Sequence, residues 1–147
     1  MGQSFLNLRM RYATFNNYYF PTTHIRILAM KFIISGSYGT DNPTMATLPF
    51  MASKTAQEQG HDVVLFLWNE AVTLARPGIG DYVIGVNLTP LKEIITAIVS
   101  TGIPIWVCGA CATAREIEES NLISGAVIKT MGDYIKTVAE REKCVAF

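Results

Sequence analysis

Charge is scarce in this sequence, and neither sign predominates. Only 16% of the 147 residues are Asp, Glu, Lys or Arg, and twelve basic residues balance twelve acidic ones. A surface for nucleic acid or an anionic membrane needs clustered basic residues, so the composition predicts no direct binding to either. Half of the residues are hydrophobic, which is typical of a sheet buried on both faces, a sizeable oligomer interface, or both.

Long hydrophobic runs are absent from the sequence. Lys31 interrupts the apolar stretch 25–34 and polar residues break the other runs, so no segment reaches the length of a membrane span. The first residues also lack the sustained apolar segment and small-residue cleavage site of a secretory signal. We therefore predict a soluble, cytoplasmic protein.

Cysteine is rare as well, with three residues in the chain. Two of them, Cys108 and Cys111, are too close in sequence for a secreted disulfide framework. In a reducing compartment such a pair is more often redox-active or metal-binding than structural. A zinc site needs two further ligands, and His61 and Cys144 would have to converge to supply them. We predict no metal site and no cofactor.

Residues 1–30 lack Asp and Glu and are rich in Asn and aromatic side chains. This segment is an organelle-type presequence, an interaction arm, or translated sequence upstream of a true start at Met30. We favour the last, because a complete α/β pattern begins directly after Met30. The prediction is an N-terminal extension over 1–29, either disordered or upstream of the true start, followed by one domain over 30–147.

The remaining chain alternates short apolar runs with helix-prone segments. The runs predict strands at 31–35, 62–68, 103–108, 125–129 and 144–147. The segments between them predict helices at 43–60, 69–76, 90–102, 112–117 and 132–143. This alternation predicts an α/β fold, a three-layer sandwich with a mainly parallel, about five-stranded sheet.

The first predicted helix contains a conflict. Asn42 as N-cap and Pro43 at the first helical position favour a start there. Pro49 then falls inside the helix, which predicts either a kink at that residue or a later start. Four side chains at helical spacing predict its buried stripe: Met45, Leu48, Ala52 and Ala56.

The run Ile105–Cys108 ends abruptly in a cysteine, which places Cys108 at the carboxyl edge of a buried strand. Ligands of open α/β sheets bind at this edge, and Gly109 allows the turn into the next helix, whose N–H groups favour an anion. Helix N-termini and Cys-X-X-Cys spacing both lower thiol pKa values. We therefore interpret Cys108 as a reactive sulfur and Cys111 as its partner. The alternative is that Cys108 is a small buried hydrophobe.

A turn-rich loop over residues 36–40 leaves the first predicted strand at the same sheet edge as Cys108. It has neither a G-x-G-x-x-G fingerprint nor a Lys-Ser/Thr phosphate-binding ending, so it predicts a turn. We expect Tyr38 to line the cleft around Cys108 and Gly39 to support it. Glu70, after the second predicted strand, is either an acid–base group or a first-turn carboxylate facing the helix dipole.

Arg115 is the basic residue nearest to the cysteine pair in the sequence. Its spacing from Cys111 places its guanidinium to face a sulfur anion. The alternative is a surface ion pair with Glu118 or Glu119. We include Arg115, together with Gly109, among the residues that support the site.

Five segments, in this order, resemble one known family. They are Phe32–Thr40, Ala56–Asp62, Ile105–Cys108, Ala112–Arg115 and Cys144–Phe147. With them the chain from Met30 onward resembles the DsrE/DsrF-like sulfur-relay family, in particular the cysteine-bearing sulfurtransferase subunit of the tRNA 2-thiolation relay. The chain departs from the pattern at Glu116, where many relatives have glycine.

The resemblance implies a cytoplasmic α/β protein that assembles as trimers or hexamers of one chain, or as hetero-oligomers with paralogues. It also implies that Cys108 carries a persulfide and that the partners are sulfur donor and acceptor proteins. Our first hypothesis is therefore a sulfur-relay protein, a sulfurtransferase-like persulfide carrier if it is active. Two alternatives stay open: a Cys-X-X-Cys dithiol redox protein, and a non-catalytic oligomeric module that binds a ligand or partner. The thioredoxin fold itself is excluded, because its later cis-proline has no counterpart after Pro104.

Overall fold

A five-stranded parallel sheet forms the centre of the domain. The computed structural model describes residues 12–15, 18–21 and 28–147. Its sheet has the strand order β6-β5-β4-β3-β7, and every neighbouring pair is parallel. In that order the strands are Ala126–Lys129, Ile105–Cys108, Asp62–Leu67, Lys31–Gly36 and Lys143–Ala146. The predicted α/β class with a parallel sheet of about five strands is confirmed.

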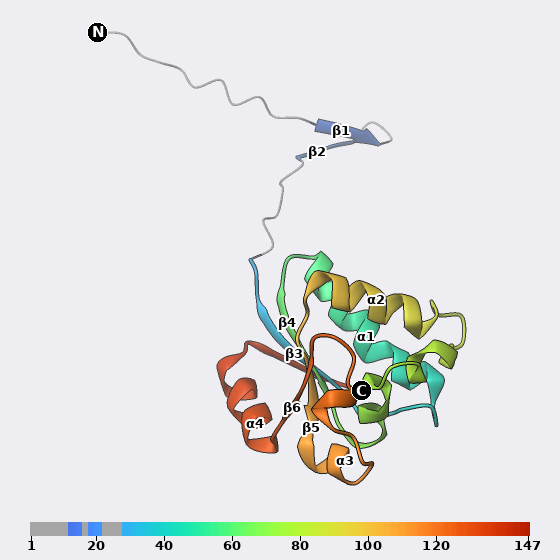
Figure 1. Ribbon diagram of the computed structural model, residues 1–147. Coiled ribbons are helices and arrows are strands. Elements are labelled where there is room, and N and C mark those ends of the chain that lie inside the picture. The colour runs from blue at the N-terminus through green and yellow to red at the C-terminus, as the bar shows by residue number, and fades with distance from the viewer. Residues whose placement is uncertain (1–11, 16–17, 22–27) are drawn as a thin grey trace.

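Helices cover both faces of this sheet. Two of them, α1 and α2, lie side by side on one face, and α4 lies on the other (Figure 1). The α-helices α1 to α4 are Pro43–Glu58, Leu91–Thr101, Gly109–Thr113 and Met131–Glu140. The 3-10 helices η1 to η3 are Asn69–Ala75, Ile79–Tyr82 and Glu119–Asn121. The layers are those of the predicted sandwich.

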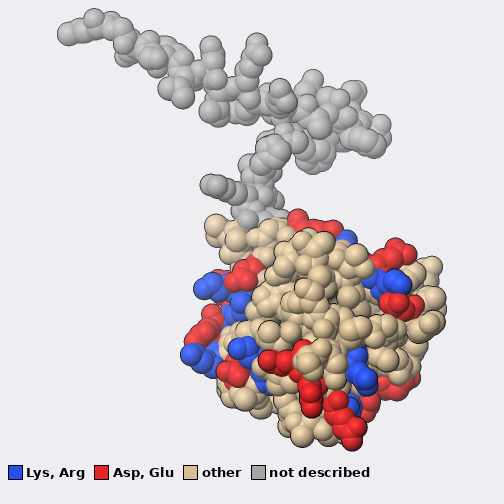
Figure 2. All heavy atoms as spheres, viewed as in Figure 1, with Lys and Arg blue, Asp and Glu red and all other residues tan. Residues whose placement is uncertain are grey.

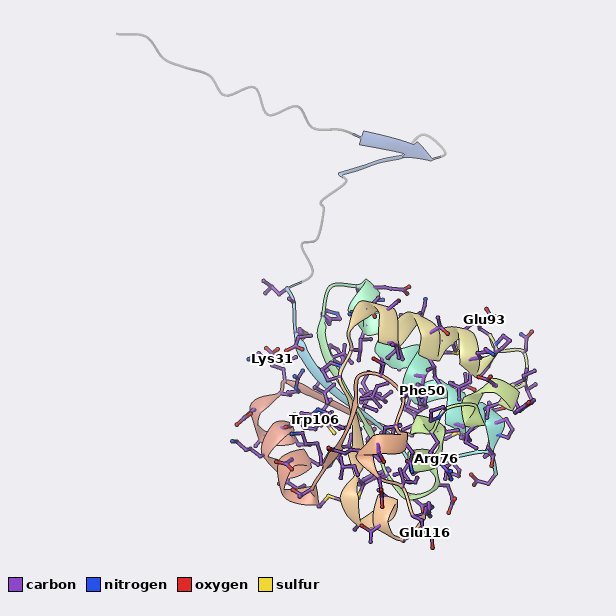
Figure 3. The ribbon with its side chains drawn as sticks, in the orientation of Figure 1. Lys31, Phe50, Arg76, Glu93, Trp106 and Glu116 are labelled. Atoms are coloured by element: carbon purple, nitrogen blue, oxygen red, sulfur yellow. The ribbon has the colours of Figure 1, made fainter. Side chains whose placement is uncertain are left out.

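The core lies between α1, α2 and the central strands. Ile33, Leu65 and Ile105, one from each central strand, are completely buried. Phe50 of α1 is also completely buried and lies against the sheet (Figure 3). Because β3, β4 and β5 are covered on both faces, their sequences are nearly continuous apolar runs. Because these strands are parallel, their carboxyl ends lie along one edge of the sheet.

Helix α1 begins where the caps predict, and it continues through Pro49. The side-chain Oδ1 of Asn42 accepts a hydrogen bond from the backbone N–H of Met45 at 3.2 Å, so the alternative of a later start is wrong. Pro49 is buried against Gly36 of β3, where a Cβ atom would lie only 2.5 Å from the Pro49 Cγ. Packing against the sheet thus compensates for the proline inside the helix.

The buried face of α1 differs from the predicted stripe. Of the four predicted residues, Met45, Leu48 and Ala52 are only partly buried and Ala56 alone belongs to the buried set. The residues that α1 buries are Ala46, Thr47, Pro49, Phe50, Ser53 and Ala56. The contact of Pro49 with Gly36 sets this rotation of the helix.

The helix after β5 is also placed differently from the prediction. Instead of spanning 112–117, α3 begins at Gly109, directly after the strand, and ends at Thr113. Glu116 then adopts a left-handed conformation with φ of +53°, and the N–H of Ile117 bonds the carbonyl of Ala112 at 3.0 Å. The segment is therefore one short helix closed by a left-handed turn.

The two N-terminal strands stand apart from the central sheet. β1 (Tyr12–Phe15) and β2 (Tyr18–Pro21) pair with each other in antiparallel register. Most of the predicted extension over 1–29 lies outside the described residues, and that prediction stays untested. In the described part of the chain, no helix has both the length and the apolar character to cross a membrane.

Candidate functional site

Cys108 occupies the carboxyl end of β5, as predicted. It pairs with Lys129 of β6 in the sheet register and immediately precedes α3. Its side chain is almost fully buried, with 4% exposed, whereas Cys111 is partly exposed. Both are free thiols. The strand end therefore presents one enclosed sulfur and one more accessible sulfur, a helical turn apart.

The two thiols interact, and their surroundings act on Cys111 in opposite directions. Burial raises the pKa of the Cys111 thiol above its ordinary value, and the neighbouring Cys108 thiol raises it further. A backbone hydrogen bond from Asn69 and the positive charge of Arg115 lower the same pKa. The net effect of these surroundings is a raised pKa of the Cys111 thiol. With five residues, α3 is too short to supply much dipole.

Arg115 forms its ion pair with a residue of η1. Its Nε donates to Glu70 Oε2 at 3.4 Å, and its Nη2 also donates to Glu70 Oε1. The Glu70 carboxylate raises the pKa of the Arg115 guanidinium. The expected alternatives, Glu118 and Glu119, are not its partners. Glu70, which is 45 residues earlier in the chain, therefore has a specific partner at the site.

Two further contacts extend this ion pair towards the cysteines. Arg115 Nη2 donates to Asn69 Oδ1 at 3.4 Å, and Nη1 donates to the backbone carbonyl of Cys111 at 3.1 Å. The backbone N–H of Asn69 donates to Cys111 Sγ at 3.2 Å. Arg115 therefore joins the segment after β4 to the segment after β5. Its link to Cys111 Sγ is indirect, because Arg115 binds Asn69 and the N–H of Asn69 donates to that sulfur.

Asn69 is a site residue that the sequence reasoning missed. It follows β4 with a φ of +47°, in the left-handed region that Asn enters more readily than most residues. This conformation accompanies the hydrogen bond from its N–H to Cys111 Sγ. An Asn directly after a buried strand was the available signal, because such residues favour turns.

Two of the remaining predicted residues, Gly39 and Gly109, pack against segments next to the site. Gly39 packs against the backbone of Glu70, where a Cβ atom would lie 2.7 Å from the Glu70 carbonyl oxygen. Gly109 lies against β6, with Ile128 Cγ2 at 3.3 Å from the position of a Cβ. Tyr38 is on the same loop as Gly39 and is 38% exposed. Both glycines permit close packing of the segments that carry the site.

The sheet face beside Cys108 carries a tryptophan and a lysine. Trp106 extends from β5 on the side of the sheet that α4 covers (Figure 3). The Lys129 ammonium lies 5.4 Å from the centre of its ring, a cation–π arrangement. Across residues 12–15, 18–21 and 28–147, no three His, Cys, Asp or Glu side chains converge as a metal site would require.

A parallel α/β sheet with a cysteine pair at the carboxyl end of a central strand defines the class of this protein. The profile of the DsrE/DsrF-like family matches residues 30–147. The chain therefore belongs to the DsrE/DsrF-like family, whose members commonly take part in sulfur relay.

Two relatives from Methanocaldococcus jannaschii share the sequence at moderate identity. The uncharacterized protein MJ0989 is 34% identical over 93 residues, which is 63% of this chain and 78% of the relative. The uncharacterized protein MJ0760 is 33% identical over 95 residues, 65% of this chain but only 34% of the relative. The matching region thus spans about a third of this second, longer protein.

A solved structure shows the same fold. The crystal structure of the ychN protein from E. coli superposes with a TM-score of 0.63 at 20% sequence identity. The match covers 81% of this chain and 98% of the ychN chain. The similarity confirms the α/β sandwich and carries no statement about activity.

Proposed function

We propose that this protein is a sulfur-relay protein that carries a persulfide on Cys108 and passes the sulfane sulfur to an acceptor protein. The observation that carries the proposal is the position of Cys108, at the end of β5 in a DsrE/DsrF-like chain and beside a second thiol. Cysteines at this sheet edge occupy the place where α/β proteins bind ligands.

The proposed transfer is a pair of thiol–persulfide exchanges. The Cys108 thiolate attacks the terminal sulfur of a donor persulfide, so that the donor S–S bond breaks and the donor leaves as a thiolate. The Cys108 persulfide then undergoes the same attack by an acceptor cysteine, and Cys108 leaves as the thiolate. No net oxidation occurs, and no cofactor is needed.

The enclosed position of Cys108 fits a carrier. With only 4% of its surface exposed, the sulfur is shielded from bulk thiols that would discharge a persulfide. The adjoining Lys129 contributes a positive charge at the same strand end, which favours a persulfide anion. The proposed donor and acceptor are proteins that present a cysteine at this sheet edge.

Assembly with further subunits is part of the proposal. Three large apolar side chains are exposed between the end of η2 and α2: Tyr82 at 89%, Ile84 at 61% and Val86 at 83%. Large exposed apolar groups are typical of interaction surfaces. Figure 2 shows acidic and basic side chains side by side around the margins of one face, with a broad uncharged area between them. We propose trimers or hexamers of this chain, or assembly with paralogues, to be tested by light scattering.

Intact-mass spectrometry after incubation with a sulfane-sulfur donor tests the carrier function. We expect wild type to gain the mass of one sulfur, removable by a reducing agent, and Cys108→Ser to gain none. Cys144→Ser is the matched control, because Cys144 is a free thiol on β7 outside the site. Equal loading of wild type and Cys108→Ser would contradict the proposal. Loss of two hydrogens without sulfur gain would indicate a dithiol redox protein instead.

A further inference from the structure

Cys111 is placed by three residues that the relay step does not use. Arg115 holds the Glu70 carboxylate, the Asn69 side-chain oxygen and the Cys111 carbonyl with one guanidinium. These contacts fix both ends of the hydrogen bond between Asn69 N–H and Cys111 Sγ, which is 3.2 Å long. We call Asn69, Glu70 and Arg115 the clamp.

The clamp maintains an unfavourable backbone conformation. A left-handed φ of +47° at Asn69 is disfavoured for any residue with a Cβ. Residues in such conformations persist where surrounding contacts hold them, and they occur preferentially at functional sites. In this conformation the N–H of Asn69 donates a hydrogen bond to Cys111 Sγ. The second observation, independent of that backbone conformation, is the position of Cys111 in α3, one helical turn after Cys108 at the end of β5.

We propose that the clamp positions Cys111 to discharge the Cys108 persulfide as hydrogen sulfide. This inference rests on the proposed function, because it requires a persulfide on Cys108. It adds an activity to it: a loaded subunit that meets no acceptor releases its sulfur and closes a disulfide. Cys111 is the reacting residue, and Asn69, Glu70 and Arg115 are positioning residues.

The discharge balances without a further reactant. The Cys111 thiolate attacks Cys108 Sγ of the persulfide, a Cys108–Cys111 disulfide forms, and the original S–S bond breaks. The outer sulfur leaves with the bonding electron pair as hydrosulfide. The sulfane sulfur is thus reduced to sulfide while the two cysteines are oxidised to a disulfide. The proton lost by Cys111 goes to solvent.

The charges around Cys111 make this step pH-dependent. Cys108 and Arg115 lie on its own segment, Glu70 on η1 is paired with Arg115, and Lys129 ends the neighbouring β6. Burial keeps the Cys111 pKa above the ordinary thiol value, against the lowering by Asn69 and Arg115. Discharge should therefore be slow at neutral pH and accelerate as the pH rises.

Single-turnover sulfide release tests the reaction itself. The full chain is loaded with sulfane sulfur, freed of donor, and followed by sulfide detection and by intact mass. We expect wild type to release sulfide and lose two hydrogens relative to the reduced protein. Cys111→Ser should load normally and release at least tenfold more slowly. Equal release rates would overturn the inference and leave the relay intact, whereas absence of loading in wild type would overturn the relay.

Alkylation of Cys111 against pH, in a Cys108→Ser and Cys144→Ser background, tests the clamp without any persulfide. A hydrogen bond to a charged group is strong enough for an approximately tenfold effect. We therefore expect Arg115→Ala and Asn69→Val to move the reaction midpoint upward by about one pH unit. Valine is β-branched and strongly disfavours the left-handed conformation. The backbone N–H at this position would then no longer point at Cys111 Sγ.

Two variants separate positioning from general damage. Asn69→Gly lacks the Oδ1 that Arg115 binds but retains the N–H and readily adopts a positive φ, so it should reverse most of the midpoint shift that Asn69→Val causes. Arg76→Ala removes an equal charge from the C-terminal end of η1, whose first residue is Asn69 (Figure 3 labels Arg76), and should leave the midpoint unchanged. If Asn69→Val and Arg115→Ala leave it unchanged as well, the clamp does not position Cys111.

Discussion

Arg115 and Glu70 form an ion pair across the ends of two neighbouring strands, with two hydrogen bonds between the guanidinium and the carboxylate. The side chains are 24% and 45% exposed, so solvent screens much of their attraction. We expect a coupling free energy of about 0.5 kcal/mol between them. A double-mutant cycle of Arg115→Ala and Glu70→Ala, measured by urea unfolding, gives this value.

The salt dependence of that coupling is the internal control. The coupling free energy should fall when the ionic strength is raised to 1 M, because the Debye length then shortens to about 3 Å, comparable with the distance between the two charges. Lys54 and Glu58 form a more exposed i,i+4 pair on α1 and provide the comparison. A coupling for Arg115 and Glu70 that is zero at low salt would contradict the prediction.

Gly36 and Pro49 provide a second prediction, on stability. A methyl group at Gly36 would meet the Pro49 ring at 2.5 Å, and overpacking of this kind destabilises proteins by about 1–3 kcal/mol. We expect Gly36→Ala to lose that amount in urea unfolding. Adding Pro49→Ala should recover part of the loss, since the Cγ that clashes is gone. Gly36→Ala and Pro49→Ala acting additively would show that the two residues are not in contact.

The buried phenol of Tyr134 should make the free energy of unfolding fall in alkaline solution. It is 7% exposed, and burial raises its pKa above the ordinary value, as does the neighbouring Cys144. A pKa raised on folding means that the neutral phenol stabilises the protein below about pH 10 and that this contribution disappears above it. Tyr134→Phe cannot ionise, so its free energy of unfolding should fall less steeply between about pH 10 and 11.

Ionisation of Cys111 should also lower the free energy of unfolding, and it should do so at a lower pH than ionisation of Tyr134. The raised pKa of Cys111 makes the wild type lose stability from about pH 8.5 upward, where free thiols ionise. The Tyr134 comparison is therefore best made in a Cys111→Ser background. A parallel decline of both proteins above pH 10 would show that the phenol ionises without effect on folding.

Local signals in the sequence predicted the sheet and the position of Cys108. The apolar runs of β3, β4 and β5 and the cap at Asn42 depend on neighbours in sequence, and the structure confirms them. The carboxyl end of β5 follows from the same runs, because parallel strands share one edge. The sequence alone therefore indicates that a site of this protein would lie at that edge of the sheet.

Contacts between distant segments were not predictable in the same way. The Arg115 partner Glu70 is 45 residues away, and helical spacing alone offered only nearer carboxylates. The buried face of α1 follows from the fit of Pro49 against Gly36, which a periodic pattern does not contain. Asn69 acts through its backbone N–H, a group that every residue except proline possesses, so side-chain chemistry gave no indication of it.

Glu116 carries the last prediction, because its backbone is in the left-handed region. Its φ of +53° is a conformation that glycine adopts readily. For a residue with a Cβ atom this left-handed conformation costs about 1–2 kcal/mol. Glycine also gives the unfolded chain more freedom, which offsets about 0.5–1 kcal/mol. We therefore expect Glu116→Gly to stabilise the protein by about 0.5–1 kcal/mol in urea unfolding. Ala114→Gly, at a helical φ of −63°, should instead destabilise it, and stabilisation by both substitutions would show that the turn at Glu116 is unstrained.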